Sequence, residues 1–230
     1  MTLYAWIMLV SFMGPFALSF DKKVAFYTWW KPLALGIFVN GLLFILWDGW
    51  FARTGVWGFN PDYVWSIRWN DLPLEEWSFF IIIPYCSVFI YACIKAYIKK
   101  EPFAQVKHQI TLFFLVATFF LALFNSTQAY TFYNCLIAST LLFIHYLFLK
   151  KEWMGYFWLA YFIHLIPFFI VNGILTGMAT DKPIVWYNDD ENIGVRILTI
   201  PIEDMVYALT CLLLPITIIE ALFTSRKKKA

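Results

Sequence analysis

The sequence predicts an all-α protein, a polytopic membrane helix bundle with about seven transmembrane helices. Of its 230 residues, 62% are hydrophobic and only 14% are charged. A soluble domain usually carries about 25% charged residues, so this chain lacks the polar surface that a water-soluble globule needs. The mean hydropathy of +0.69 supports the same conclusion. We therefore expect an integral membrane protein surrounded by the lipid bilayer.

Seven stretches of the chain qualify, or nearly qualify, as membrane spans. A spanning helix needs roughly 20 mostly apolar residues. In chain order, the expected spans are 2–20, 32–52, 73–98, 107–124, 131–149, 154–176 and 200–223. The first stretch lacks the basic segment that opens a signal peptide, so we expect it to remain as the first helix.

The second and third spans share sequence with the sixth and seventh, which indicates an internal repeat. Short matches pair Val39-Asn40-Gly41 with Val171-Asn172-Gly173, and Val56-Trp57 with Val185-Trp186. The strongest match joins Leu72-Pro73-Leu74-Glu75-Glu76 to Ile200-Pro201-Ile202-Glu203-Asp204. An arginine, Arg68 or Arg196, stands seven residues before the first carboxylate of each copy.

This repeat divides the chain into three parts. We expect a first three-helix repeat with the Pro-x-Glu-Glu motif at 1–104, a linking transmembrane helix at 105–128, and a second three-helix repeat with the Pro-x-Glu-Asp motif at 129–230. A three-span unit copied head to tail would be inverted in the membrane, and the extra span restores its orientation. The two acidic motifs should therefore face the same side.

The basic residues predict which side that is. Loops rich in Lys and Arg lie in the cytoplasm. If the basic tail at 226–229 is cytoplasmic, 13 of the 17 basic residues fall on that side, and the outer face keeps only Arg53, Arg68, Lys182 and Arg196. We expect a cytoplasmic C-terminus and an outer N-terminus.

The acidic motifs are the main candidates for chemistry. We expect each proline at the first helical position, where its missing N–H costs nothing. Glu75, Glu76, Glu203 and Asp204 then occupy the third and fourth helical positions, where the helix dipole favours anions. Capping alone would explain one acidic helix start, but not two copies that each come with an Arg and an Asn. Because ionisable groups in a membrane are costly, we interpret the four acids as catalytic.

Adjacent carboxyls can take different protonation states. Burial and like charge keep one protonated, while the helix terminus and Arg68 or Arg196 hold the other ionised. Asn40 and Asn172 should reach toward the acids from the second and sixth spans. The two motifs can converge on one pocket shared by both halves, with two separate sites as the alternative.

Aromatic residues, among them Trp57, Trp77 and Trp186, lie near the acids in the sequence. One explanation is the aromatic belt that anchors membrane proteins at the interface. The other is a pocket wall whose ring faces stabilise a carbocation. Both can hold at once.

Several other classes of function lack their signatures. The chain contains neither GxGxxG nor GxxxxGK[ST], so it has no nucleotide-binding fingerprint. His108, His145 and His164 are dispersed over three spans without a metal-binding spacing, so no metal site is expected. Nucleic acid is not an expected partner, because the basic run is a short tail that membrane orientation explains.

At Asn40, Trp47-Asp48, Trp57 and the two Pro-x-Glu-(Glu/Asp) copies, the chain resembles the lycopene cyclase domain family over essentially its whole length. These are small membrane enzymes of carotenoid biosynthesis that occur as two three-helix subunits or as one fused chain, and this sequence is similar to the fused form. The cyclase part of fungal bifunctional lycopene cyclase/phytoene synthase is related. The second copy departs from the pattern, with Thr180 and Asp181 where the first has Asp48.

The resemblance implies conversion of the linear ψ-end of lycopene, via γ-carotene, to β-ionone rings. An acid protonates the terminal double bond, the next double bond attacks the cation, and a base removes a ring proton. The family's essential acids correspond to Glu75, Glu76, Glu203 and Asp204. This isomerisation needs no cofactor by its stoichiometry. A carotenoid hydratase of a related membrane family, or a non-enzymatic proton-coupled transporter, remains as an alternative, and the oligomeric state stays open.

The topology can be tested with reporters. A reporter fused after Arg226 should report the cytoplasm and one inserted near Asp189 should report the outside, because the basic residues divide so unevenly. Alkaline phosphatase and fluorescent protein fusions measure this directly. Both reporters on the same side would contradict the seven-span arrangement.

Overall fold

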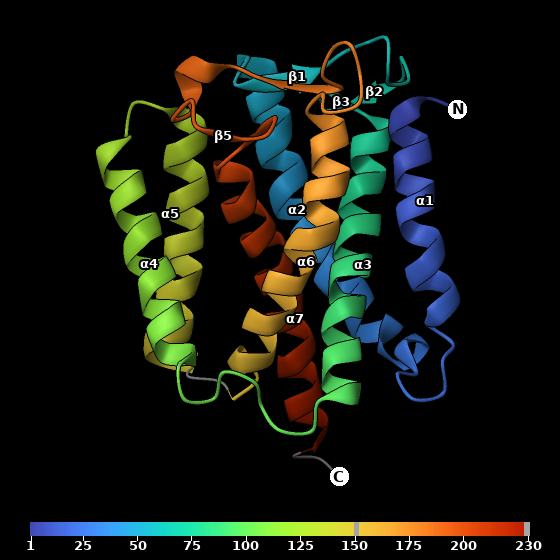
Figure 1. Cartoon of the computed structure of the whole chain (residues 1–230), viewed down its shortest axis with the longest axis vertical. Coiled ribbons are helices and arrows are strands. Elements are labelled where there is room, and N and C mark those ends of the chain that lie inside the picture. The colour runs from blue at the N-terminus through green and yellow to red at the C-terminus, as the bar shows by residue number, and fades with distance from the viewer. Residues whose placement is uncertain (150–151, 228–230) are drawn as a thin grey trace.

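The computed structural model describes residues 1–149 and 152–227, which form an all-α helix bundle with small strands gathered at one end (Figure 1). The fold class predicted from the sequence is confirmed. Lys150, Lys151, Lys228 and Lys229, which entered the charge count, lie outside the described residues.

The bounds of the elements follow the expected spans closely. The helices are α1 (Leu3–Leu18), η1 (Phe26–Trp29), α2 (Trp30–Thr54), α3 (Leu74–Tyr97), α4 (Lys107–Phe124), α5 (Ala129–Ile144), η2 (His145–Leu149), α6 (Met154–Leu175), η3 (Asp189–Glu191) and α7 (Glu203–Lys227). The strands are β1 (Trp57–Phe59), β2 (Arg68–Trp69), β3 (Leu72–Pro73), β4 (Val185–Tyr187), β5 (Arg196–Ile197) and β6 (Ile200–Pro201).

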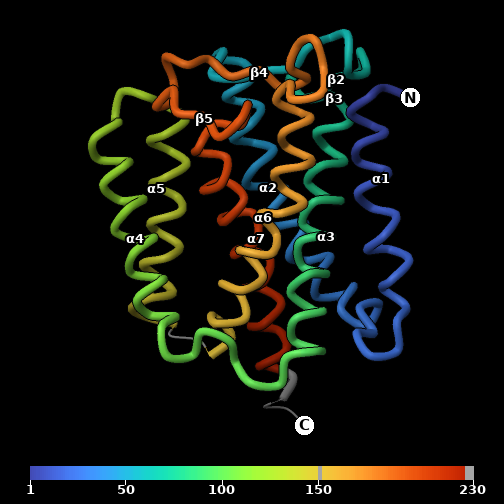
Figure 2. Tube along the Cα trace, viewed as in Figure 1, coloured from blue at the N-terminus to red at the C-terminus, as the bar shows by residue number. Residues whose placement is uncertain are grey.

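Six helices in the described part of the chain are long and apolar enough to cross a membrane, and α1 is apolar but shorter, with 16 residues. The protein is therefore an integral membrane protein. The trace in Figure 2 starts α1 at the end of the bundle that carries the strands and ends α7 at the opposite end.

Short hairpins, which the sequence did not predict, precede α3 and α7. In each, an arginine pairs with the motif proline, Arg68 with Pro73 and Arg196 with Pro201. Each arginine also closes the turn through its Nη1, which donates to the Asp71 carbonyl at 3.3 Å in the first copy and to the Thr199 carbonyl at 3.0 Å in the second.

Contrary to expectation, the prolines therefore do not occupy the first helical position. Pro73 has the extended conformation (φ −67°, ψ 158°) and caps α3 from outside, because its fixed φ suits a short edge strand as well as a helix start. Glu75 and Glu76 consequently hold the second and third helical positions. In the second copy α7 begins at Glu203 itself. All four acids lie closer to the helix ends than predicted.

Strands β1 and β4 join the two halves of the chain. Gly58 lies opposite Trp186, and the flanking hydrogen bonds run from the Asn60 amide to the Ile184 carbonyl and from the Asn188 amide to the Val56 carbonyl, both at 2.9 Å. Equivalent residues of the two halves are 128 positions apart, 60 with 188, 56 with 184 and 58 with 186. The contacts therefore follow a local two-fold axis. The sequence match of Val56-Trp57 to Val185-Trp186 is one residue out of this register.

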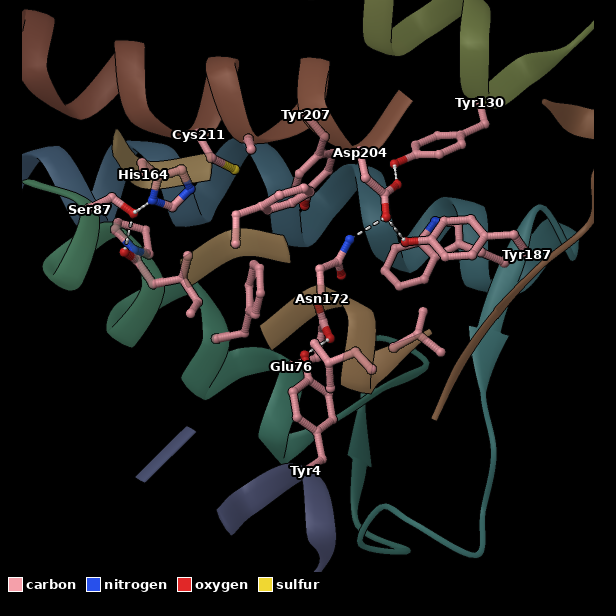
Figure 3. Close-up of a pocket in the computed structure, with 18 residues that line it drawn as sticks. Tyr4, Glu76, Ser87, Tyr130, His164, Asn172, Tyr187, Asp204, Tyr207 and Cys211 are labelled. Carbon is pink, nitrogen blue, oxygen red and sulfur yellow. Dashed lines mark hydrogen bonds between the residues drawn. The ribbon is translucent and has the colours of Figure 1, made fainter. Parts of the chain in front are cut away.

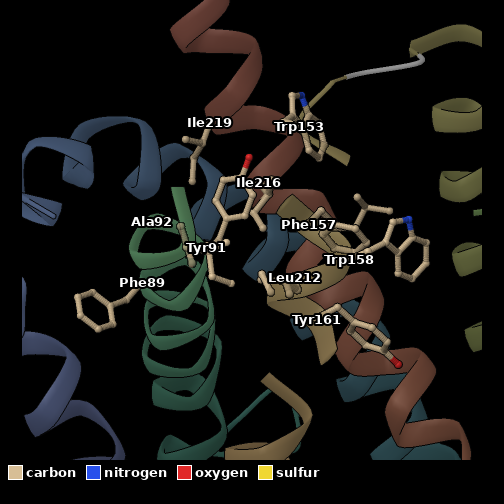
Figure 4. Packing of buried hydrophobic residues seen from close by; sticks show 14 of the residues in the cluster. Phe89, Tyr91, Ala92, Trp153, Phe157, Trp158, Tyr161, Leu212, Ile216 and Ile219 are labelled. Atoms are coloured by element: carbon tan, nitrogen blue, oxygen red, sulfur yellow. The ribbon is translucent and has the colours of Figure 1, made fainter. Parts of the chain in front are cut away.

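The core divides into two clusters of buried side chains. The cluster in Figure 4 fills the space between α3, α6 and α7 with residues such as Tyr91, Trp158 and Leu212. The other surrounds the strand-bearing end of the helices and includes Tyr4, Trp57 and Tyr130. The second cluster surrounds the space in which the candidate site lies.

The contact between β1 and β4 gives a stability prediction. A Cβ atom on Gly58 would lie 2.6 Å from Trp186 Cζ2, so Gly58→Ala should lower the free energy of unfolding by about 1–3 kcal/mol. The control is Gly14→Ala on α1, where no heavy atom lies within 4 Å of the new Cβ. Thermal unfolding in detergent measures both, and equal stability would contradict the close packing of Trp186 on Gly58.

Candidate active site

A buried cavity lies between the two halves of the bundle, at the end that carries the strands (Figure 3). Its walls come from the first half, through α1, β1 and α3, and from the second half, through α5, α6, β4 and α7. Glu76 and Asp204 both line it, so the structure brings one acid of each motif to a single space. We call this space the acid cavity.

A tyrosine from the first helix of each half donates to the acid in this cavity. Tyr4 Oη on α1 donates to Glu76 Oε2 at 2.6 Å, and Tyr130 Oη on α5 donates to Asp204 Oδ1. All four side chains belong to buried or nearly buried residues. The two halves thus build the same local arrangement around their second carboxyl group.

The two acids differ in their remaining partners. Asp204 Oδ2 also accepts from Asn172 Nδ2 at 2.6 Å and from Tyr187 Oη at 3.0 Å, which gives Asp204 three donors. Glu76 accepts one side-chain hydrogen bond within the described part of the chain. The strand residue 128 positions before Tyr187 is Phe59, which has no hydroxyl. The same framework therefore surrounds its two acids with unequal numbers of donors.

Tyr187 keeps its proton and so remains a donor. Burial raises the pKa of Tyr187 well above its usual value of 10.0, and the nearby Asp204 carboxylate raises it further. Asp204 is therefore held by a phenol that does not ionise at ordinary pH, and hydrogen bonds of this kind stabilise a carboxylate.

The first acid of each motif has a different place. Glu75 Oε1 accepts from Thr2 Oγ1 at 2.5 Å and from the Trp65 amide at 2.9 Å. Glu203 Oε1 accepts from Thr131 Oγ1 at 2.7 Å and from the Ile193 amide at 2.8 Å. In both copies this amide lies ten residues before the acid, and neither acid lines the acid cavity.

These bonds fasten three elements together. Each first acid ties its own helix start to the first helix of the same half and to the loop before the hairpin. Its neighbour in the chain is thereby turned toward the cavity. The sequence had suggested that the two adjacent carboxyls of one motif share a site, whereas in the structure only the second acid of each motif lines the acid cavity. The acids that share a cavity come instead from different motifs.

A family model described as lycopene cyclase matches residues 1–94 and 127–222. The chain belongs to the lycopene cyclase family. No curated protein and no solved structure matches the chain. The matched segments leave out α4, which lies at Lys107–Phe124.

Membership gives the protein its general role. A lycopene cyclase is an enzyme of carotenoid biosynthesis, and its substrate is a carotenoid that resides among membrane lipids. A reactive site within a bundle of apolar helices suits such a water-insoluble substrate.

In this lycopene cyclase family member the arginines do not contact the motif acids, contrary to expectation. Arg196 Nη2 donates to Asp189 Oδ1 at 2.5 Å, and this bond lowers the pKa of Asp189. Arg68 is exposed and bonds to the hairpin turn within the described residues. A guanidinium group is costly to bury, so both arginines stay at the polar end of the bundle and stabilise the hairpins.

Two of the three predicted tryptophans also lie elsewhere. Trp57 lines the acid cavity and stacks with Tyr187, with ring centroids 6.2 Å apart. Trp77 instead stacks on Trp69 and donates its Nε1 to the Trp69 carbonyl at 3.0 Å. Trp186 is 40% exposed and covers Gly58. The interfacial belt accounts better for Trp77 and Trp186.

The remaining predicted residues lie on α2, behind the cavity wall. Asp48 Oδ2 accepts from Tyr207 Oη at 2.8 Å, and Tyr207 itself lines the acid cavity. The Asn40 side chain is fully buried and lies beside the Cys211 thiol rather than bonding to Glu76, so it does not mirror the contact that Asn172 makes with Asp204.

The structure adds site residues that sequence reasoning missed. Four tyrosines, Tyr4, Tyr130, Tyr187 and Tyr207, contact the buried acids. A hydrogen bond of 3.1 Å joins Ser87 Oγ to His164 Nδ1 on the same cavity wall. Residues 1–149 and 152–227 contain no group of three metal-binding side chains. With 13 tyrosines in the chain, position alone could not single out these four.

The bonds to Glu203 predict a structural role. Glu203→Ala should lower the free energy of unfolding by about 1–3 kcal/mol, because the Thr131 hydroxyl and the Ile193 amide would lose their buried acceptor. Glu203→Gln keeps an acceptor oxygen and should lower the free energy of unfolding by a smaller amount. Thermal unfolding of both variants in detergent tests this, and two variants as stable as the unchanged protein would contradict the role.

Proposed function

We propose that this protein converts the ψ-ends of lycopene, via γ-carotene, into β-ionone rings by redox-neutral acid–base cyclisation. The observation that carries the proposal is the acid cavity, in which Glu76 and Asp204 from opposite halves face one apolar space with unequal hydrogen bonding. Family membership supports the substrate class.

The reaction needs one proton in and one proton out. A carboxylic acid adds its proton to the terminal double bond and leaves a tertiary cation. The electrons of the next double bond attack that cation, close the six-membered ring and move the positive charge onto a ring carbon. A carboxylate then takes a proton from the neighbouring ring carbon, and the electrons of the broken C–H bond form the ring double bond. No redox cofactor is needed, because substrate and product are isomers.

We assign the proton donor to Glu76 and the proton acceptor to Asp204. Glu76 is buried and receives one hydrogen bond, from a tyrosine that can equally accept, so its protonated form is favoured. Asp204 receives three hydrogen bonds, one of them from an amide N–H, which can only donate. Two acids in different environments can thus perform different proton transfers, as general acid–base catalysis requires.

Aromatic rings supply the environment for the cation. Trp57, Tyr187 and Tyr207 line the acid cavity, and Tyr130 stacks with Tyr187 at a centroid distance of 5.5 Å. Ring faces attract cations, the more strongly where water is excluded. Preorganised groups of this kind stabilise charge as it develops in the transition state.

The two-repeat organisation fits a single shared site. Each repeat contributes one acid, one tyrosine from its first helix and one strand of the β1–β4 pair. In this proposal, Glu75 and Glu203 position the neighbouring acids, and Asp48 positions Tyr207. Because the basic loops lie at the other end of the chain's spans, the acid cavity is on the outer side of a bacterial inner membrane.

The acid assignment is tested by four single variants. Glu76→Gln and Asp204→Asn should each reduce ring formation by about 10²-fold or more, because an amide cannot transfer the proton. Glu75→Gln and Glu203→Gln retain an acceptor oxygen and should lose much less activity. Pigments from lycopene-accumulating cells that express each variant measure the outcome, with membrane protein level as the control.

Three results would contradict the proposal in different ways. Near-normal ring formation in Glu76→Gln or Asp204→Asn removes that residue from the mechanism. Equal losses in Glu75→Gln and Glu76→Gln refute the division of roles within the motif. Hydroxylated linear carotenoids in place of ring products from the unchanged protein identify a hydratase, in which water captures the first cation.

A further inference from the structure

A second cavity, which we call the lateral groove, opens beside the acid cavity. It has a volume of about 320 Å³ and lies between α1, α3 and α6. Its outer rim includes Pro167 and Ile170, both exposed on the surface of the bundle that faces the membrane. The groove therefore opens sideways, toward lipid.

The lateral groove and the acid cavity adjoin each other. Six residues line both of them, namely Phe79, Ile83, Ser87, His164, Phe168 and Asn172. The Ser87–His164 hydrogen bond lies where the two cavities adjoin, and Figure 3 shows the pair at the left, with Asn172 and the two acids farther to the right. The groove therefore leads from the lipid-facing surface to the wall of the cavity that contains Glu76 and Asp204.

The two serine hydroxyls on the groove wall are bonded to their own helices. Ser11 Oγ donates to the Ile7 carbonyl and Ser87 Oγ to the Ile83 carbonyl, both at 2.7 Å. Hydroxyls bonded to their own helix present little polarity to a ligand. The groove is lined by hydrocarbon and aromatic groups and offers few free donors or acceptors.

Prolines shape this wall without exposing the backbone. Pro15 lacks the N–H that would bond to the Ser11 carbonyl one turn earlier. The Cys86 thiol on α3 donates to that carbonyl at 3.4 Å, so the bond joins α1 to α3 along the groove. Backbone groups that face lipid must find such partners.

We propose that the lateral groove binds the linear polyene chain of the carotenoid and admits it from the membrane, so that only its end group enters the acid cavity. This rests on the proposed function. The occupant is a hydrocarbon without polar groups, because the wall is mostly apolar and offers few partners to a lipid headgroup. Its reactive end must reach the acids, and the groove borders the acid cavity along the six shared residues.

The test fills the groove with a bulky side chain. Cys86→Trp should form rings about tenfold more slowly than Cys86→Ala, because both lose the thiol bond to Ser11 and only Trp occupies the groove. Val171→Trp repeats the test from the α6 wall in case the first variant does not fold. Ala117→Trp adds equal bulk to a lipid-facing hollow on α4 and should behave as the unchanged protein.

A binding measurement separates this proposal from the proposed function. Each Trp substitution is combined with Glu76→Gln, and the lycopene that purifies with the protein is quantified by absorbance. Groove variants should retain about tenfold less lycopene than Glu76→Gln alone or its Ala117→Trp combination.

Ring formation and bound lycopene that are unchanged in both groove variants overturn the groove proposal and leave the function intact, as expected if only a lipid acyl chain lies there. An unchanged protein that forms no rings overturns the proposed function. Bound lycopene alone then decides whether the groove holds the polyene.

Discussion

A polar group inside a bilayer must find its partner within the protein, and the two acidic helix starts show how this chain meets that constraint. At each start, one carboxylate holds a hydroxyl from another helix and an amide from the preceding loop. That anchor fixes the direction of the next carboxylate in the chain. The cavity, its tyrosines and the hairpins above it all depend on these anchors.

The difference between Glu76 and Asp204 arises from a few side chains rather than from the backbone. Phe59 lacks the hydroxyl that Tyr187 provides, and the Asn40 side chain does not reach its acid as Asn172 does. Both halves of a repeated framework can therefore keep the same fold while their acids acquire different chemistry. The placement of hydrogen-bond donors, not helix packing, distinguishes the surroundings of the two acids.

The sequence predicted the helices well because a stretch of about 20 mostly apolar residues is stable in a membrane only as a spanning helix. It did not predict strands of two or three residues, which show no periodicity. The arginine partners were wrong because equal spacing from the acids also suits a hairpin turn that Arg68 and Arg196 close. The acids themselves were predictable from their repetition, whereas which of each pair faces the cavity depends on bonds to Thr2 and Thr131 far away in the chain.

The pairing of Gly58 with Trp186 disfavours a symmetric dimer made from two copies of one half of this chain. The two residues occupy equivalent positions across the local two-fold axis, and the indole lies where a side chain on residue 58 would be. A symmetric dimer of either half would bring two glycines or two indoles together at this point, leaving a gap or a collision. One small and one large residue fit only when the halves differ. The asymmetry of the acids is thus matched by an asymmetry in the contact that joins the halves, so each half is specific for the other.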